Sequence, residues 1–122
     1  MNGNIFIDTN IAIYLLGGNE QIADLLDQQT VCLSFVTELE LLSKPDITID
    51  EEIRIKALLS QCVILDFFPS LKEIVIDFRK KYRIKLPDAI VAATAFALGL
   101  PLISADKGFQ KVIELVLVKI EI

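Results

Sequence analysis

Four acidic side chains occupy places in the sequence where a folded α/β chain would bring them together. Asp8 ends an apolar segment, Glu40 lies in a leucine-rich segment, Asp88 opens a long apolar stretch, and Asp106 follows a further apolar segment. Unit charges about 4 Å apart repel by roughly 1 to 4 kcal/mol, so converging carboxylates must protonate, separate or bind cations. Because oxygen ligands of this kind favour Mg²⁺ or Mn²⁺, the four acids indicate a divalent metal site.

Each of these acids also has a simpler explanation when it is taken alone. Asp8 could cap the helix that begins near residue 9, and Asp88 could interact with a helix dipole. Asp106 could be a turn or cap residue, and Glu40 could be a solvated residue of an amphipathic helix. Only the joint placement of the four favours a shared site.

The composition excludes several kinds of chemistry. The chain has no histidine, which removes Ser-His-Asp and Cys-His mechanisms and every zinc site that needs histidine. Cys32 and Cys62 are too few for a zinc motif, and each lies in a short apolar run typical of a buried strand. Any chemistry therefore belongs to carboxylates, hydroxyls, lysines or a metal.

The hydropathy predicts one compact domain over residues 1–122. The chain is 53% hydrophobic and its mean hydropathy is +0.55. The apolar stretch 89–103 contains Gly99 and Pro101, so we expect a core helix followed by a strand and no membrane span. The beginning, MNGNIFID, has no export signal, and two buried thiols fit a reducing compartment, so a cytoplasmic location is expected.

Strands and helices are predicted to alternate along the chain. Helix breaks are expected at Gly17 and Gly18 and before Pro45, a cap at Ser70, and a helix start at Pro87. The expected strands are 4–8, 31–34, 62–67, 101–104 and 115–122, and the expected helices are 9–16, 20–29, 36–43, 50–61, 70–82 and 87–98.

The strands are continuous apolar runs, which indicates a sheet covered by helices on both faces. The predicted fold is therefore an α/β class, three-layer α/β/α sandwich with a short, mostly parallel central sheet of about five strands. In such sheets ligands bind beyond the carboxyl ends of the strands, where Asp8 and Asp106 are expected.

Three segments, in this order, resemble the PIN-domain ribonucleases, and in particular the VapC toxins of toxin–antitoxin pairs. The segments are FIDTNIAIYLL, LSFVTELELL and KLPDAIVAATAFALGLPLISAD. The resemblance implies metal-dependent cleavage of RNA with Mg²⁺ or Mn²⁺, a cognate antitoxin as partner, and a homodimer. The residues implied to bind metal and to be catalytic are Asp8, Glu40, Asp88 and Asp106, and those implied to orient ligands and phosphate are Thr9 or Asn10 and Ser104.

The choice of Glu40 over Glu38 rests on the resemblance. On a helical wheel centred on Leu39 and Leu42, the two glutamates flank the apolar stripe almost symmetrically. The family pattern places the acid three residues after a threonine, which is Thr37 here. Many family members also carry a further acid at the position of Gly108, so a second metal site is not expected.

The net charge of −5 is unfavourable for RNA binding, which draws affinity from lysine and arginine. The segment RKKYRIK (79–85) places five basic residues in seven just before Asp88, and its tyrosine could stack on a base. The alternative is a solvated helix end whose cations complement the helix dipole. The candidate residues for RNA guidance are Arg79, Lys80, Lys81, Tyr82, Arg83 and Lys85.

Other classes of function stay open from the sequence. A receiver domain would use Asp66 as phosphoacceptor, but the acidic pair expected after the first strand is missing. A haloacid-dehalogenase-like phosphatase would use Asp8, but Asn10 stands where it needs a second carboxylate. A partner-binding protein without catalysis could retain the acids for a structural metal.

Overall fold

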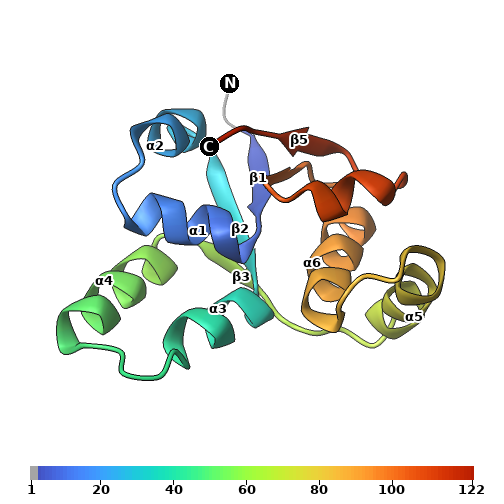
Figure 1. Ribbon diagram of the computed structural model, residues 1–122, viewed down its shortest axis with the longest axis horizontal. Coiled ribbons are helices and arrows are strands. Elements are labelled where there is room, and N and C mark those ends of the chain that lie inside the picture. The colour runs from blue at the N-terminus through green and yellow to red at the C-terminus, as the bar shows by residue number, and fades with distance from the viewer. Residues whose placement is uncertain (1–2) are drawn as a thin grey trace.

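The computed structural model describes residues 3–122 and consists of strands alternating with helices (Figure 1). None of the helices in this range is long and apolar enough to cross a membrane. The elements in chain order are β1 (Asn4–Ile7), α1 (Thr9–Leu16), α2 (Glu20–Leu26), β2 (Thr30–Ser34), α3 (Phe35–Leu42), α4 (Ile49–Ser60), β3 (Val63–Leu65), α5 (Leu71–Tyr82), α6 (Leu86–Ala97), β4 (Leu102–Ser104), the 3₁₀ helix η1 (Lys107–Lys111) and β5 (Leu117–Lys119).

The five strands form one parallel sheet in the order β3-β2-β1-β4-β5. The strand at the centre is β1, which pairs with β2 on one side and with β4 on the other. The chain therefore winds outward from β1 in both directions, and the β1–β4 boundary is the topological switch point of the sheet. Ligands of open parallel sheets bind at such a point, beyond the carboxyl ends of the strands.

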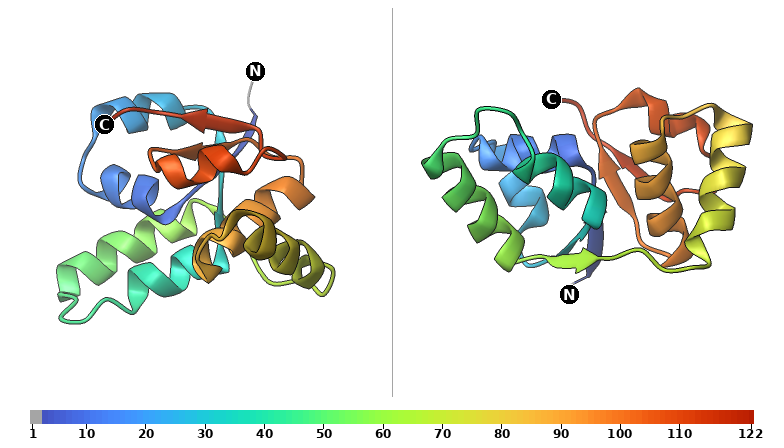
Figure 2. Two further views of the ribbon diagram at one scale, coloured as in Figure 1. Left: turned by 45° about the vertical axis from the view of Figure 1, so that its right-hand side comes forward. Right: turned by 90° about the horizontal axis from the view of Figure 1, so that it is seen from below.

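Helices cover both faces of the sheet, which confirms the predicted three-layer α/β/α architecture (Figure 1, Figure 2). On one face α5, α6 and η1 pack against Phe6, Cys32 and Leu102, with Phe78 at the centre of α5. On the other face α1, α2, α3 and α4 pack against Ile7, Leu33 and Ile103. Each strand thus sends alternate side chains into two separate cores.

Local signals set the helix starts and ends that matter for the site. The side chain of Asp8 caps α1, because its Oδ1 atom accepts a hydrogen bond from the backbone N–H of Ile11 at 2.9 Å. Pro87 lies in the first turn of α6, as predicted, and Gly99 follows that helix with φ of 65°, a conformation that favours glycine. The cap of α1 and the first turn of α6 both carry candidate site acids.

Several predicted boundaries are wrong, mostly at the ends of elements. The helix predicted for 20–29 ends at Leu26, because Gln28 adopts a left-handed φ of 65°. The strands predicted for 62–67 and 115–122 shrink to three residues each, since both are edge strands that pair on one side only. The 3₁₀ helix η1 was not predicted. Ser70 precedes α5 as expected, but its side chain makes no capping hydrogen bond.

The cysteines are structural, although only Cys32 lies in a strand. Cys32 is buried in β2, whereas Cys62 is half-buried and comes just before β3, so the prediction of a strand position for it is wrong. Burial raises the pKa of the Cys32 thiol, and burial together with the nearby Cys32 raises the pKa of Cys62 to about 11. Thiols with raised pKa values hold little thiolate at neutral pH and are poor nucleophiles.

Candidate metal centre

Asp8 lies at the carboxyl end of β1, only 4% exposed, at the switch point of the sheet. Its Oδ2 atom accepts a hydrogen bond from the Ser104 hydroxyl at the end of β4. That hydroxyl in turn accepts the backbone N–H of Asp106 at 2.9 Å. Asp8 therefore caps α1, as the simpler explanation held, and also connects the ends of the two central strands.

The electrostatic environment of Asp8 is unfavourable for a carboxylate. Burial is the main cause that raises its pKa, and the charge of Asp106 raises it further. The hydrogen bonds from Ser104 and Ile11 act in the opposite direction but do not outweigh burial. A cation beside Asp8 would stabilise the charged carboxylate and lower its pKa.

Asp88 is the acid on which the charges of the other three all act. It lies half-buried in the first turn of α6. Burial raises its pKa most, followed by the charges of Asp106, Asp8 and Glu40, while Lys85 lowers it. Four carboxylates from four separate segments of the chain are therefore close enough to repel one another.

Glu40 and not Glu38 contacts this cluster. The Thr9 hydroxyl donates to Oε1 of Glu40 at 2.7 Å, and Thr9 is also 2.9 Å from the hydroxyl of Thr37. The wheel centred on Leu39 is wrong, because Leu39 is 59% exposed while Thr37 on the opposite side of α3 is buried. The buried face of α3 therefore includes Thr37 and not Leu39. With the helix in this orientation, the Glu40 side chain reaches Thr9.

Thr37 is a residue whose contact the sequence did not predict. It is fully buried, and its only hydroxyl neighbour in the described chain is Thr9. The Thr9 hydroxyl has one proton and donates it to Glu40. Thr37 is therefore the donor in the hydrogen bond between the two threonine hydroxyls. A polar residue on the apolar face of α3, three positions before the acid, was the available signal.

Asp106 lies at the start of η1 and is half-buried. Its Oδ1 atom accepts the backbone N–H of Gly108 at 2.8 Å, so the simpler explanation as a cap also holds here. A Cβ atom at residue 108 would lie 3.2 Å from that oxygen. Glycine at this place therefore leaves the Asp106 carboxylate uncrowded, where a larger side chain would press on it.

The donor set fits a hard divalent cation, although the acids do not form a closed cage. Within residues 3–122, no three acidic or thiol side chains converge closely enough to enclose an ion in this conformation. The four carboxylates are all oxygen donors, they repel one another, and the pKa values of Asp8 and Asp88 are raised. Oxygen donors with unrelieved negative charge match Mg²⁺ or Mn²⁺ chemically.

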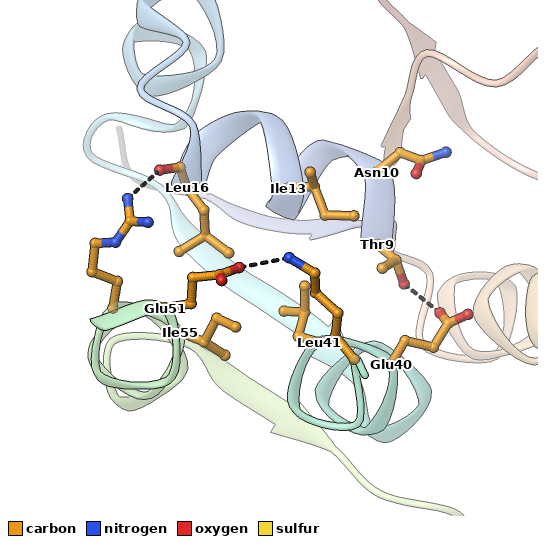
Figure 3. A pocket seen from close by; sticks show the side chains of 10 residues that line it. Thr9, Asn10, Ile13, Leu16, Glu40, Leu41, Glu51 and Ile55 are labelled. Atoms are coloured by element: carbon orange, nitrogen blue, oxygen red, sulfur yellow. Dashed lines mark hydrogen bonds and ion pairs between the residues drawn. The ribbon is translucent and has the colours of Figure 1, made fainter. Parts of the chain in front are cut away.

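A pocket of about 470 Å³ opens beside the acids between α1, α3 and α4 (Figure 3). Thr9 and Glu40 form one end of it, and its walls are partly apolar, with Ile13 and Ile55 among them. A Lys44–Glu51 ion pair of 2.7 Å crosses another part of the wall. Asn10 also lines the pocket, but its side chain points away from the Thr9–Glu40 hydrogen bond.

The basic segment before α6 is partly occupied by internal contacts. Lys81 pairs with Asp77 at 3.2 Å and with Glu114 at 3.0 Å, and the Tyr82 hydroxyl donates to Glu114. The Tyr82 hydroxyl is thus held by a contact within the chain. The Tyr82 and Lys81 hydrogen bonds hold the pKa of Glu114 below its usual value.

The remaining candidates for RNA guidance have mixed environments. The Nε atom of Arg79 donates to the backbone oxygen of Ile84 at 3.4 Å, and Arg83 ends α5 in a left-handed conformation with φ of 55°. Lys80 and Lys85 are exposed, and Lys85 is near enough to lower the pKa of Asp88. Lys85 is therefore the member of the segment with an electrostatic link to the acids.

Asp66 lies outside the acid cluster. It follows the edge strand β3, and its Oδ1 atom accepts the backbone N–H of Phe67 at 2.8 Å. A receiver domain needs its phosphoacceptor beside an acidic pair at the centre of the sheet, so this position does not favour that alternative.

Comparison with known proteins agrees with the fold. The model of the PIN domain family matches residues 5–115. The structure is similar to VapBC2 from Rickettsia felis bound to a promoter DNA fragment, with a TM-score of 0.85, 20% identity, and 98% of each chain covered. It is also similar to a toxin–antitoxin complex from Klebsiella pneumoniae, with a TM-score of 0.83, 29% identity, and 97% of this chain and 99% of that chain covered.

A third similar structure is VapBC-1 from nontypeable Haemophilus influenzae, with a TM-score of 0.78, 24% identity, and 98% of each chain covered. A search of curated protein sequences found no match.

Proposed function

Because the chain belongs to the PIN domain family, whose members are nucleases, we propose that it is a metal-dependent endoribonuclease and the toxin of a toxin–antitoxin pair. The observation that carries this proposal is the mutual electrostatic influence of Asp8, Glu40, Asp88 and Asp106 at the switch point of the sheet. Phosphodiester hydrolysis needs positive charge beside the scissile phosphate, and a metal held by these acids would provide it.

The four acids and their neighbours have separate roles in this proposal. A bound Mg²⁺ or Mn²⁺ would polarise the scissile phosphate and activate the attacking water. Asp8 would hold the ion from the buried side, and an acid of the exposed side, such as Glu40, could accept the proton of the water. Ser104 would orient Asp8, and Thr9 would orient Glu40 through the contacts described above.

Purified protein with an end-labelled structured RNA tests the activity directly. We expect cleavage with Mg²⁺ or Mn²⁺ and none with EDTA. The products should carry 5′-phosphate and 3′-hydroxyl ends, because water and not the RNA 2′-hydroxyl is the nucleophile. A 2′,3′-cyclic phosphate end, or equal cutting in EDTA, would contradict the mechanism.

The assignment of Glu40 predicts different behaviour for two neighbouring glutamates. Glu40→Gln should lower the rate of metal-dependent cleavage about 5- to 1,000-fold, because a unit charge about 4 Å from a cation is worth roughly 1 to 4 kcal/mol. Glu38→Gln is the matched control on the same helix, and its rate should stay within about twofold of wild type. Cleavage rates at saturating Mg²⁺ measure both variants. Equal losses in the two would contradict a specific role for Glu40 and would indicate that any negative charge on α3 has the same effect.

The partner in this proposal is an antitoxin that occupies the toxin surface and blocks the acid cluster. The pocket between α1, α3 and α4 shares Thr9 and Glu40 with the candidate centre, so a partner segment bound there would cover Glu40. The similar structures from Rickettsia felis and Haemophilus influenzae are VapBC proteins, which supports this assignment. We also propose that residues 1–122 form one domain and that two copies associate as a homodimer.

A further inference from the structure

A second pocket, of about 290 Å³, lies next to Asp106 between α1, η1 and β5. Ala105 and Lys107, the residues on either side of Asp106, belong to its lining. Tyr14 of α1, Lys119 of β5 and Glu121 complete the polar part of it. The views of Figure 2 agree that the C-terminal end of the chain runs back toward the N-terminal helices.

Neither lysine of this pocket forms an ion pair within residues 3–122. The ion pairs found in residues 3–122 use the cations Lys44, Lys56 and Lys81. Glu121 also lines the pocket, yet it forms no ion pair with Lys107 or Lys119. Lys119 is moreover half-buried. A cation that has lost part of its hydration without gaining a partner is better satisfied when an anion binds.

The backbone register places the pocket beside the candidate metal centre. Lys119 is the partner of Ser104 across the β4–β5 pair, and the Ser104 hydroxyl donates to Asp8. Lys107 follows Asp106 directly. Two cations therefore flank the acid cluster on its β5 side, in a chain whose net charge is −5. Local positive charge of this kind is what an acidic protein needs to hold a polyanion near its acids.

We propose that Tyr14, Lys107 and Lys119 bind a phosphate of the RNA backbone next to the phosphate that is cut. The proposal deepens the proposed ribonuclease function and rests on it. The two ammonium groups supply charge, and the Tyr14 hydroxyl supplies a neutral donor to a phosphate oxygen. A phosphate contact carries no sequence information, so this subsite fixes the position of the RNA and not the choice of base.

The test combines RNA binding with kinetics for the double variant Lys107→Gln/Lys119→Gln. Binding of a short fluorescein-labelled single-stranded RNA is measured by anisotropy in an Asp8→Asn background with Mg²⁺, so that the RNA stays intact. We expect Kd to rise about fivefold at about 0.1 M salt, and the slope of log K against log salt to fall by about 0.7, the value for one single-strand phosphate contact. In the otherwise wild-type protein, KM should rise while kcat changes little.

Two matched variants separate the lost contact from general effects. Lys111→Gln removes a charge from the same η1 helix outside the pocket and should leave Kd and the slope unchanged. Lys107→Arg/Lys119→Arg keeps the charges and should restore binding if the double glutamine variant loses affinity through charge. Unchanged Kd and slope in the glutamine variant would overturn the proposal, and so would an equal loss in Lys111→Gln.

Failure of this subsite and failure of the nuclease assignment give different results. If the wild-type protein cuts RNA with metal but the double variant binds like its parent, only the subsite is wrong. If the wild-type protein neither binds nor cuts RNA, both proposals fall. A poly-glutamate peptide that competes as well as RNA, and does so only when both lysines are present, would make the pocket a site for a protein carboxylate and overturn the phosphate assignment.

Discussion

Asp8→Asn should lower metal-dependent RNA cleavage about a thousandfold while the protein stays folded. Asp8 is the most buried of the four acids, and a unit charge about 4 Å from a cation at the edge of the interior is worth roughly 4 kcal/mol, which is about three decades in rate. Asparagine keeps an oxygen for the Ile11 N–H, and its amide can donate to the Ser104 hydroxyl. The Ile11 hydrogen bond therefore survives, the bond with Ser104 reverses its direction, and the main loss is the charge.

Thermal unfolding with and without metal distinguishes a lost metal ligand from a damaged fold. Without metal, the variant should melt no lower than wild type, because burial and the charge of Asp106 already disfavour the Asp8 carboxylate. With Mn²⁺ at about 100 times its Kd, wild type should gain about 2.7 kcal/mol of stability, and the variant should gain much less. Activity retained in the identically purified variant would point to a contaminating nuclease or to a different site.

Phe78→Ala should lower the free energy of unfolding by about 3 to 5 kcal/mol, the usual range for truncating a buried phenylalanine. Phe78 is 1% exposed in α5, and its ring lies 5.9 Å from Tyr82 and 5.7 Å from Phe96 of α6, measured between ring centroids. These contacts hold α5 against α6, the helix that carries Asp88. A loss of this size is a large part of the roughly 5 to 15 kcal/mol typical of a folded domain.

Urea unfolding of Phe78→Ala and of Ile76→Ala measures this effect with an internal reference. Ile76 lies on the same helix but is 54% exposed, so its truncation should change stability by no more than about 0.5 kcal/mol. Equal destabilisation by both variants would contradict the assignment of the loss to the core contact, because alanine has the higher helix propensity at both positions. Where Phe78→Ala remains folded, its cleavage rate per folded molecule should be close to wild type, since Phe78 lies in the hydrophobic core between α5 and α6.

Local patterns in the sequence were enough to predict the layers of the fold and two of the site positions. Short apolar runs that end in Asp8 and Ser104 mark strands buried on both faces, and ligands of parallel sheets bind beyond their carboxyl ends. Pro87 and Gly99 mark the limits of α6 through backbone restrictions that act within a few residues. These signals are local, so they need no knowledge of which segments meet.

Only the tertiary structure decided how distant segments meet at the site. The contact between Thr9 and Glu40 joins residues far apart in the chain, and the helical period alone left Glu38 equally eligible. Glu114 contacts Lys81 and Tyr82 of the basic segment, and β-pairing brings Lys119 level with Ser104. Periodicity determines which face of a helix or strand is buried. Sheet order and packing determine which other segments of the chain that face and the polar residues beside it will contact.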